Sequence, residues 1–310
     1  MHSQYQGEVL AELVRNGMVE SVHSGHYLAL NADGSIYKSK GNIDLPIFPR
    51  SSVKLFQAAA MVRNGLKVTP QQLALIQSSH SGAKMHQDAI LNLLTEFRFT
   101  ESDLHNATDK PLGALERELW GSHPATRLAM NCSGKHAGML ATCALNHWDT
   151  KNYLSLDHPL QQAVLKEIEI ATGEEVINRT FDGCGAPLFS VTVRGLARAL
   201  HMATVSADPV YQEVMAAARQ YPELVGGEGR LNTRMMQAIP GLFMKDGMEA
   251  VLVASLEDGR TLVIKIADGS LRAVGTIIQA AFAEWGIKTP DEKMNVYGGS
   301  EIVGGMRATL

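Results

Sequence analysis

The chain has 310 residues, of which 45% are hydrophobic and 19% are charged, and this globular composition excludes disorder for most of its length. Lys and Arg total 28 against 32 Asp and Glu, giving a net charge of −4 without a basic cluster, so we expect no nucleic-acid partner. No apolar run approaches the ~18 residues of a membrane-spanning helix, and the start does not resemble a secretory leader. We therefore expect a cytoplasmic protein without membrane contact.

The first segment, residues 8–46, has the pattern of β-structure. Apolar and polar side chains alternate from Ser21 to Leu30, a turn sequence follows at Asn31–Gly34, and the alternation resumes at Ser35–Tyr37. This pattern predicts a β-hairpin.

Residues 50–240 are mostly helical by pattern. A serine at position 51 or 52 is placed as the N-cap of a helix that Gly65 closes, and Thr69-Pro70 begins the next helix. The helices expected from amphipathic periodicity span 51–65, 71–77, 84–97, 135–146, 159–172, 188–203, 209–220 and 231–239.

Residues 242–310 return to strands, which we expect at 242–245, 250–256 and 261–267, before a last helix at 273–285. Turns are expected at Asp246-Gly247 and Asp258-Gly259. This order of strands, helices and strands along the chain predicts an α+β fold. Its antiparallel sheet would be assembled from the N- and C-terminal segments and flanked by helices, with an α-helical subdomain inserted between these segments. Residues 1–310 would form a single catalytic unit, with the active site between the layers.

Ser51 and Lys54 form a Ser-x-x-Lys tetrad at a predicted helix start. Residues three apart share one helix face, so Lys54 can reach the Ser51 hydroxyl, and a lysine that has lost its proton can activate a serine as a nucleophile. For the tetrad alone, a helix cap followed by a surface lysine is the commoner explanation.

Two later features favour the catalytic explanation. Ser79 lies in Ser78–Gly82 at the end of an apolar helix, and Lys265 is the charged residue of the otherwise apolar strand 261–266. Penicillin-recognising serine hydrolases and class A β-lactamases combine Ser-x-x-Lys, a second polar motif in the helical domain and a lysine on a late strand, in this order. The alternative for Lys265 is an edge-strand lysine that faces water.

The three cysteines are odd in number, which argues against a disulfide framework. Cys132 and Cys184, with a histidine or lysine nearby, could bind a zinc-like ion. Two buried structural cysteines are the commoner explanation of their spacing, and Cys143 belongs to the apolar face of a helix.

A glycine-rich turn at 226–229 precedes a predicted helix start. The order of residues in this turn differs from the sequence motifs of phosphate-binding loops. We interpret it as a substrate-facing loop that presents Glu228 and Arg230.

Together these residues resemble the asparaginase II family of rhizobial-type L-asparaginases, which are similar in fold to serine β-lactamases and glutaminases. The resemblance covers most of the chain, and the run Cys132–His136 is its most specific part. The matching segments are Val19–His23, Arg50–Lys54, Ser79–Ser81, Asn131–Met139, Asp182–Cys184, Gly227–Thr233 and Lys265–Gly269.

The resemblance implies an L-asparaginase that hydrolyses L-asparagine to L-aspartate and ammonia through a serine acyl-enzyme. Two Ser-Lys pairs, Ser51 with Lys54 and Ser79 with Lys265, would face each other across the substrate. Ser51 would be the nucleophile. Lys54 would take its proton and return one to the departing ammonia, while the other pair would support proton transfer.

The resemblance also implies a homodimer, and a zinc ion bound by Cys132, Lys135 and Cys184 beside the site, with Asp182 supporting these ligands. The residues expected to contact substrate are Arg50, His80, Asp182, Glu228 and Arg230.

Two alternatives remain open. A glutaminase or another β-lactamase-like serine amidohydrolase would differ in pocket length, and one methylene contributes only about 1–3 kcal/mol to discrimination. The alternative of another class is a non-catalytic zinc- or amino-acid-binding protein. The four polar residues Ser51, Lys54, Ser79 and Lys265 argue against it, because buried polar groups are costly to desolvate.

Overall fold

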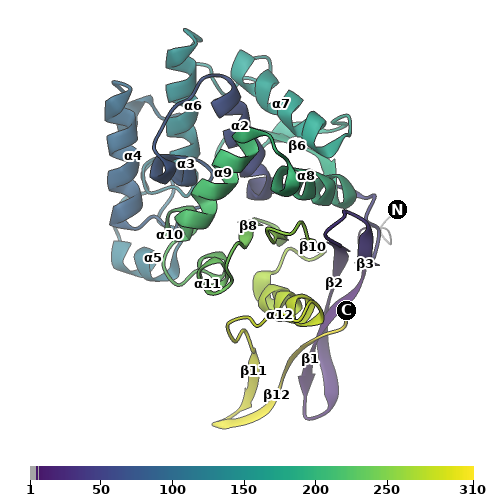
Figure 1. Cartoon of the computed structure of the whole chain (residues 1–310). Helices are drawn as coiled ribbons and strands as arrows, with labels where there is room; N and C mark the ends of the chain where they lie inside the picture. The colour runs from purple at the N-terminus through teal and green to yellow at the C-terminus, as the bar shows by residue number, and fades with distance from the viewer. Residues whose placement is uncertain (1–4, 6) are drawn as a thin grey trace.

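The computed structural model describes residue 5 and residues 7–310, and its fold is α+β, as predicted (Figure 1). Within the described residues, eight strands form an antiparallel sheet in the order β11-β12-β1-β2-β10-β9-β8, and β3 pairs with β2 beside this path. Its strands are β1 (Glu8–Arg15), β2 (Met18–Leu30), β3 (Ile36–Lys40), β8 (Phe243–Gly247), β9 (Val251–Ser255), β10 (Thr261–Ile266), β11 (Asn295–Gly298) and β12 (Glu301–Ala308).

The two ends of the chain meet in the middle of this sheet. β2 pairs with β10, with His26 opposite Lys265 and Leu30 opposite Thr261. β1 pairs with β12, with Leu13 opposite Met306. The predicted assembly of the sheet from N- and C-terminal segments is therefore confirmed, as is the hairpin of β2 and β3.

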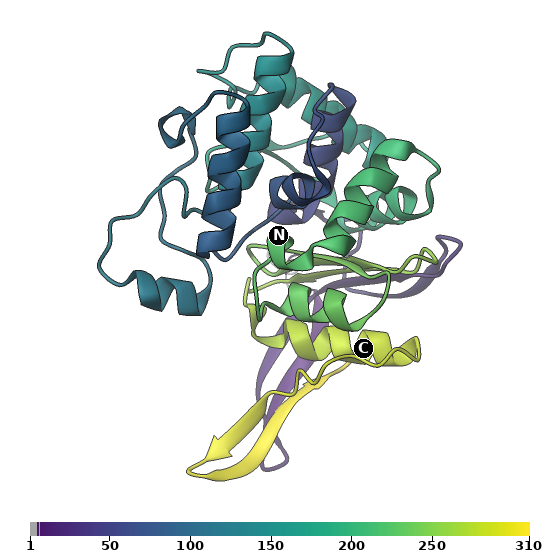
Figure 2. The same cartoon turned by 60° about the vertical axis from the view of Figure 1, so that its left-hand side comes forward.

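Helices cover both faces of the central strands. α8 (Val193–Val205) packs against β2, β9 and β10, and α12 (Val274–Glu284) packs against β1 and β12. Figure 2 shows α12 on the side of the sheet away from the helical region. Because both faces are covered, β9 and β10 are apolar at almost every position rather than at every second one.

Between β3 and β8 the chain forms the helical region, with α2 packed against α6, α7 and α9. Helix α3 starts where the sequence predicts, since Thr69 and Gln72 form a capping box and Pro70 is its first helical residue. The N-cap role predicted for Ser51 or Ser52 is wrong, because both lie inside the 3₁₀ turn Arg50–Val53, and α2 begins after Val53 without a side-chain cap bond. The other helices are α2 (Lys54–Arg63), α3 (Pro70–Ile76), α4 (Lys84–Glu96), α5 (Ala114–Trp120), α6 (Ser133–Leu145), α7 (Pro159–Thr172), α9 (Pro209–Gln220), α10 (Pro222–Val225) and α11 (Leu231–Ala238).

Two predicted boundaries are wrong. The helix predicted over 188–203 begins only at Val193, because residues 187–192 form the short strands β6 (Pro187–Phe189) and β7 (Val191–Thr192), which pair with β5 (Arg179–Phe181) and β4 (Pro46–Ile47). The turn predicted at Asp246-Gly247 lies inside β8, whose pairing with β9 continues to Gly247 opposite Val251.

No helix within the described residues combines the length and the apolar character that a membrane crossing requires.

Candidate active site

The first element of the site is the tight turn that precedes α2. Residues Arg50–Val53 form a 3₁₀ turn, in which the backbone N–H and the hydroxyl of Ser52 both donate to the carbonyl of Pro49, at 3.2 and 2.7 Å. Arg50 adopts a φ of +53°, which is costly for a residue with a side chain. This strained turn places Ser51 at the wall of a cavity of about 300 Å³.

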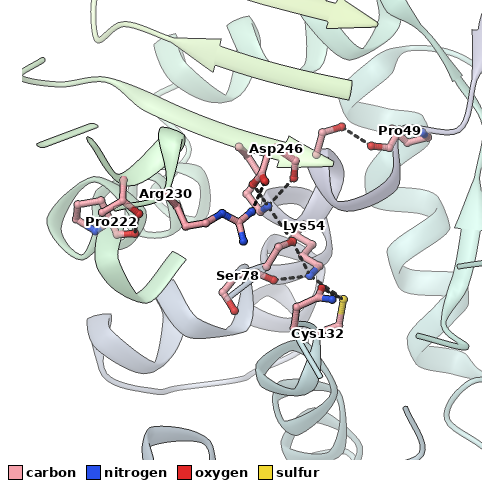
Figure 3. A network of polar contacts seen from close by, with 12 residues as sticks. Pro49, Lys54, Ser78, Cys132, Pro222, Arg230 and Asp246 are labelled. Atoms are coloured by element: carbon pink, nitrogen blue, oxygen red, sulfur yellow. Dashed lines mark hydrogen bonds and ion pairs between the residues drawn. The ribbon is translucent and has the colours of Figure 1, made fainter. Parts of the chain in front are cut away.

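Lys54 is the first residue of α2, and its side chain is buried. Its ammonium donates to the carbonyl of Ser78, to Ser79 Oγ at 3.2 Å and to Cys132 Sγ at 3.0 Å (Figure 3). These bonds use all three N–H groups, so the expected hydrogen bond from Lys54 to Ser51 is not formed. The ammonium instead finds acceptors deeper in the helical region.

A second buried lysine meets the same serine, and it is Lys245 rather than Lys265. Lys245 Nζ, on β8, donates to Ser79 Oγ at 2.9 Å and to Asp246 Oδ1 at 3.0 Å. The predicted pairing of Ser79 with Lys265 is wrong. Lys265 donates to the carbonyls of Glu249 and Ile266, both at 2.6 Å, and lines a different cavity.

The strand order explains this correction. β10, which carries Lys265, lies inside the sheet between β2 and β9, whereas β8 is the last strand and packs against the 3₁₀ turn that holds Ser51. The signal that selected Lys265, a charge within an apolar strand, is also present in Phe243-Met244-Lys245. That signal alone could have found Lys245.

The protonation of Lys245 is set by burial and by its neighbours. Burial lowers the pKa of Lys245 to about 8, with Lys54 and Arg230 acting in the same direction and Asp246 opposing them. A lysine with this pKa can accept and return protons near neutral pH.

Asp246 lies between two cations at the end of β8. It accepts from Arg230 Nη2 at 2.6 Å through Oδ2 and from Lys245 through Oδ1 (Figure 3). Burial opposes ionisation, but Lys245 and Arg230 hold the pKa of Asp246 well below its usual range. No local pattern in the sequence marks Asp246 as a site residue.

The cavity brings the two serines together with this charged group. Gly247 allows β8 to lie close to the turn, because a Cβ there would stand 2.8 Å from the Pro49 carbonyl oxygen and 3.2 Å from the Ser51 nitrogen. The lining residues are Ser51, Ser79, Leu112, Gly113, Ala114, Asn131, Arg230, Asp246, Gly247, Met248 and Leu271.

Of the five residues expected to contact substrate, only Arg230 lines this cavity. Arg50 instead lines the cavity that contains Lys265, and its guanidinium pairs with Asp182 at 2.6 Å. His80 is fully buried and bonded to Ser133, so its side chain cannot meet a ligand in the cavity. Glu228 is exposed on its loop.

The cysteines divide as the sequence indicated, with Cys143 in the core and the other two in a buried polar cluster. Lys135 Nζ lies 3.3 Å from Cys184 Sγ. A hydrogen bond between the two thiol groups raises the pKa of Cys132 and lowers that of Cys184 well below its usual value, which Lys135 also favours. These shifts favour ionisation of Cys184 over ionisation of Cys132.

This donor set is compatible with zinc. Thiolates are favoured zinc ligands, and nitrogen donors complete many such sites. Among the described residues, no group of three or more His, Cys, Asp or Glu side chains could hold a metal ion, so a three-donor site requires the amine of Lys135. Burial opposes protonation, but Cys184 and Cys132 raise the pKa of Lys135, so a metal would have to displace a proton from it.

Comparison with protein families gives a match over nearly the whole chain. A family model described as L-asparaginase II matches residues 11–306. No curated protein sequence matches. Among solved structures, one described as the crystal structure of Mglu in its native form in the presence of 4.3 M NaCl matches with 13% identity and a TM-score of 0.38, covering 88% of this chain and 65% of that chain. The chain thus spans less than two thirds of the length of that protein.

Proposed function

Because the chain belongs to the L-asparaginase II family, we propose that it hydrolyses the side-chain amide of L-asparagine, giving L-aspartate and ammonia through a serine acyl-enzyme. The chain is an amidohydrolase of the asparaginase type. The observation that supports the serine mechanism is that Ser79 Oγ accepts hydrogen bonds from two buried lysines, Lys54 and Lys245, at the wall of a cavity that Ser51 also lines.

In this proposal Ser51 is the nucleophile. Its Oγ attacks the amide carbon, and its proton passes through Ser79 to Lys245, whose lowered pKa suits a base. The proton returns to the leaving nitrogen when the C–N bond breaks, which releases ammonia. Water then attacks the ester carbon and regenerates Ser51 by the same proton path.

The negative oxygen that forms during each attack needs a donor that is already in place. We assign this role to the backbone N–H of Ser51, at the start of the 3₁₀ turn, where helix-type N–H groups lack internal partners. The close approach of Gly247 to this nitrogen keeps the turn in position.

We further propose that Cys132, Lys135 and Cys184 hold a zinc ion. The ion would supply positive charge next to the serine-lysine centre. Lys54 connects the cysteine cluster to the serine-lysine centre, because its ammonium bonds to both Cys132 and Ser79. From the family resemblance we also expect a homodimer. A measurement of the molar mass in solution would test this expectation.

The experiment that tests the activity is ammonia release from asparagine by the purified protein, compared with Ser51→Ala and Ser79→Ala. We expect losses on the order of 10³-fold or more for Ser51→Ala and no acyl-enzyme in a rapidly quenched sample of that variant. Covalent acyl-enzyme on Ser79 in Ser51→Ala would instead make Ser79 the nucleophile.

The same assay decides between the alternatives. Faster turnover of glutamine than of asparagine would make the protein a glutaminase. Binding of asparagine without release of ammonia from any amino-acid amide would make it a non-catalytic binding protein, and the proposed function would be wrong.

A further inference from the structure

The Asp246 carboxylate accepts hydrogen bonds from two cationic side chains of the candidate site, and these side chains come from different parts of the chain. One oxygen accepts from Lys245, on the same strand, and the other accepts from Arg230, which precedes α11. The carboxylate lines the cavity and is 20% exposed. A change at Asp246 therefore reaches both cations at once.

Arg230 has donors to spare. Its guanidinium carries five N–H groups, and among the hydrogen bonds of the described residues only its Nη2 is engaged, by Asp246. The side chain is 22% exposed and lines the same cavity as Ser51. A planar guanidinium held at one corner presents its other N–H groups in a geometry that matches a carboxylate.

We propose that Asp246 is a positioning residue that aims Arg230 at the free α-carboxylate of the amino-acid substrate and holds Lys245 against Ser79. This inference rests on the proposed function. The inference adds to the proposed function that the site requires a free α-carboxylate on its substrate. Asparagine is therefore preferred over its α-methyl ester, which lacks that negative charge.

The charges around Lys245 give the inference a second, independent consequence. Lys245 is faced by Asp246 from its own strand, by Lys54 from α2 and by Arg230 from the segment before α11, and it donates to the Ser79 hydroxyl. Asp246 is the anion of this group. Its neutral replacement leaves two cations beside Lys245 and favours the amine form.

Kinetics of Asp246→Asn test both consequences with asparagine and its α-methyl ester as substrates. We expect the wild type to prefer asparagine by about 10-fold or more in kcat/KM, the size of one charge-assisted interaction. In Asp246→Asn we expect that preference to disappear, mainly through a higher KM for asparagine, and the acidic limb of the kcat/KM profile to move to lower pH. Asp246→Glu should restore part of the preference.

Glu292→Gln is the matched control. Glu292 pairs with Arg234 at 2.5 Å, one helical turn beyond Arg230, and neither residue lines the cavity. This variant also loses an Arg–carboxylate pair, yet we expect the wild-type preference and pH profile. A wild-type preference and an unmoved acidic limb in Asp246→Asn, with thermal melting showing a folded protein, would overturn the inference.

A readout that needs no turnover separates this inference from the proposed function. In protein labelled with ¹³C-lysine, Lys245→Arg identifies the Lys245 signal by its loss, and the signal is then titrated in the wild type and in Asp246→Asn. We expect titration at lower pH in Asp246→Asn, and equal titration in both would contradict the coupling. If the wild type releases no ammonia from asparagine or glutamine, the proposed function and the carboxylate requirement fail, while this titration still decides whether Asp246 controls Lys245.

Discussion

The ammonium of Lys54 lies 3.0 Å from the sulfur of Cys132. The same ammonium lies 3.2 Å from Ser79 Oγ, so one helix residue connects the serine-lysine centre to the cysteine cluster. A change in the cluster therefore acts on a group that also contacts Ser79, without a long path through the protein.

Loss of a cluster cysteine is expected to remove bound zinc. Cys184→Ser takes away a sulfur ligand of the proposed site, so we expect about one zinc per chain in the wild type and a value near zero in the variant, measured by elemental analysis after gel filtration. Cys143→Ser is the control, because Cys143 is buried elsewhere in the core. Equal metal content in the wild type and Cys184→Ser would exclude the proposed ligand set.

Removal of Lys245 is expected to be far more harmful than removal of Lys265. Lys245→Ala deletes a donor to Ser79, and we expect kcat to fall by about 10²–10⁴-fold. Lys265→Ala deletes two bonds to backbone carbonyls, so we expect a small loss of thermal stability and kcat within about 2-fold of the wild type. The reverse ranking in an ammonia-release assay would restore Lys265 as the catalytic lysine.

The pH dependence of activity should follow the amine of Lys245. A base must be unprotonated, and with a pKa of about 8 only about a tenth of the Lys245 side chains are neutral at pH 7. We therefore expect kcat/KM to rise about tenfold per pH unit below this pKa and to level off above it. A profile that is flat from pH 6 to 9 would show that Lys245 is not the base.

A methyl group at position 247 is expected to impair catalysis. In Gly247→Ala the new Cβ would stand 2.8 Å from the Pro49 carbonyl oxygen and 3.2 Å from the Ser51 nitrogen, so the strand and the turn must separate. A displacement approaching 1 Å can cost about 100-fold in rate, and we expect a loss of that order in kcat with a modest drop in melting temperature.

Gly298→Ala serves as its control, because a Cβ there meets the side chain of Val303 on the neighbouring strand rather than backbone. We expect wild-type kcat in this variant. Wild-type kcat in Gly247→Ala as well would mean that the contact between β8 and the turn is not needed for turnover.

Local patterns in the sequence were sufficient for part of the site. Ser51, Lys54 and Ser79 were selected by spacing and by their places at helix ends, and the structure brings all three to one region because these helix ends are neighbours. The grouping of Cys132, Lys135 and Cys184 came from the family resemblance, since their spacing alone favoured two buried structural cysteines. Ser51, Lys54 and Ser79 each lie within a few residues of a helix boundary, where local rules are strongest.

The lysine of the late strand required information that local patterns lack. β8 and β10 each carry one lysine among apolar residues, and only the order of strands in the sheet decides which one faces Ser79. Asp246 was missed for a related reason, since Asp-Gly is a common turn sequence and β8 continues through it. The pairing of β8 with β9 thus overrode the turn preference of Asp246-Gly247, and Asp246 is the residue that supplies the negative charge of the site.

The pairing of β2 with β10 also has a consequence for synthesis. It joins residues 25–30 to residues 261–266, so the edge of β2 that β10 covers stays open until most of the chain has left the ribosome. Lys245 follows Ser51 by 194 positions (245 minus 51), and a nascent chain that already holds both serines and Lys54 still lacks the base that we propose. During that interval the open edge of β2 is the place where a chaperone, or a second unfinished chain, competes with β10.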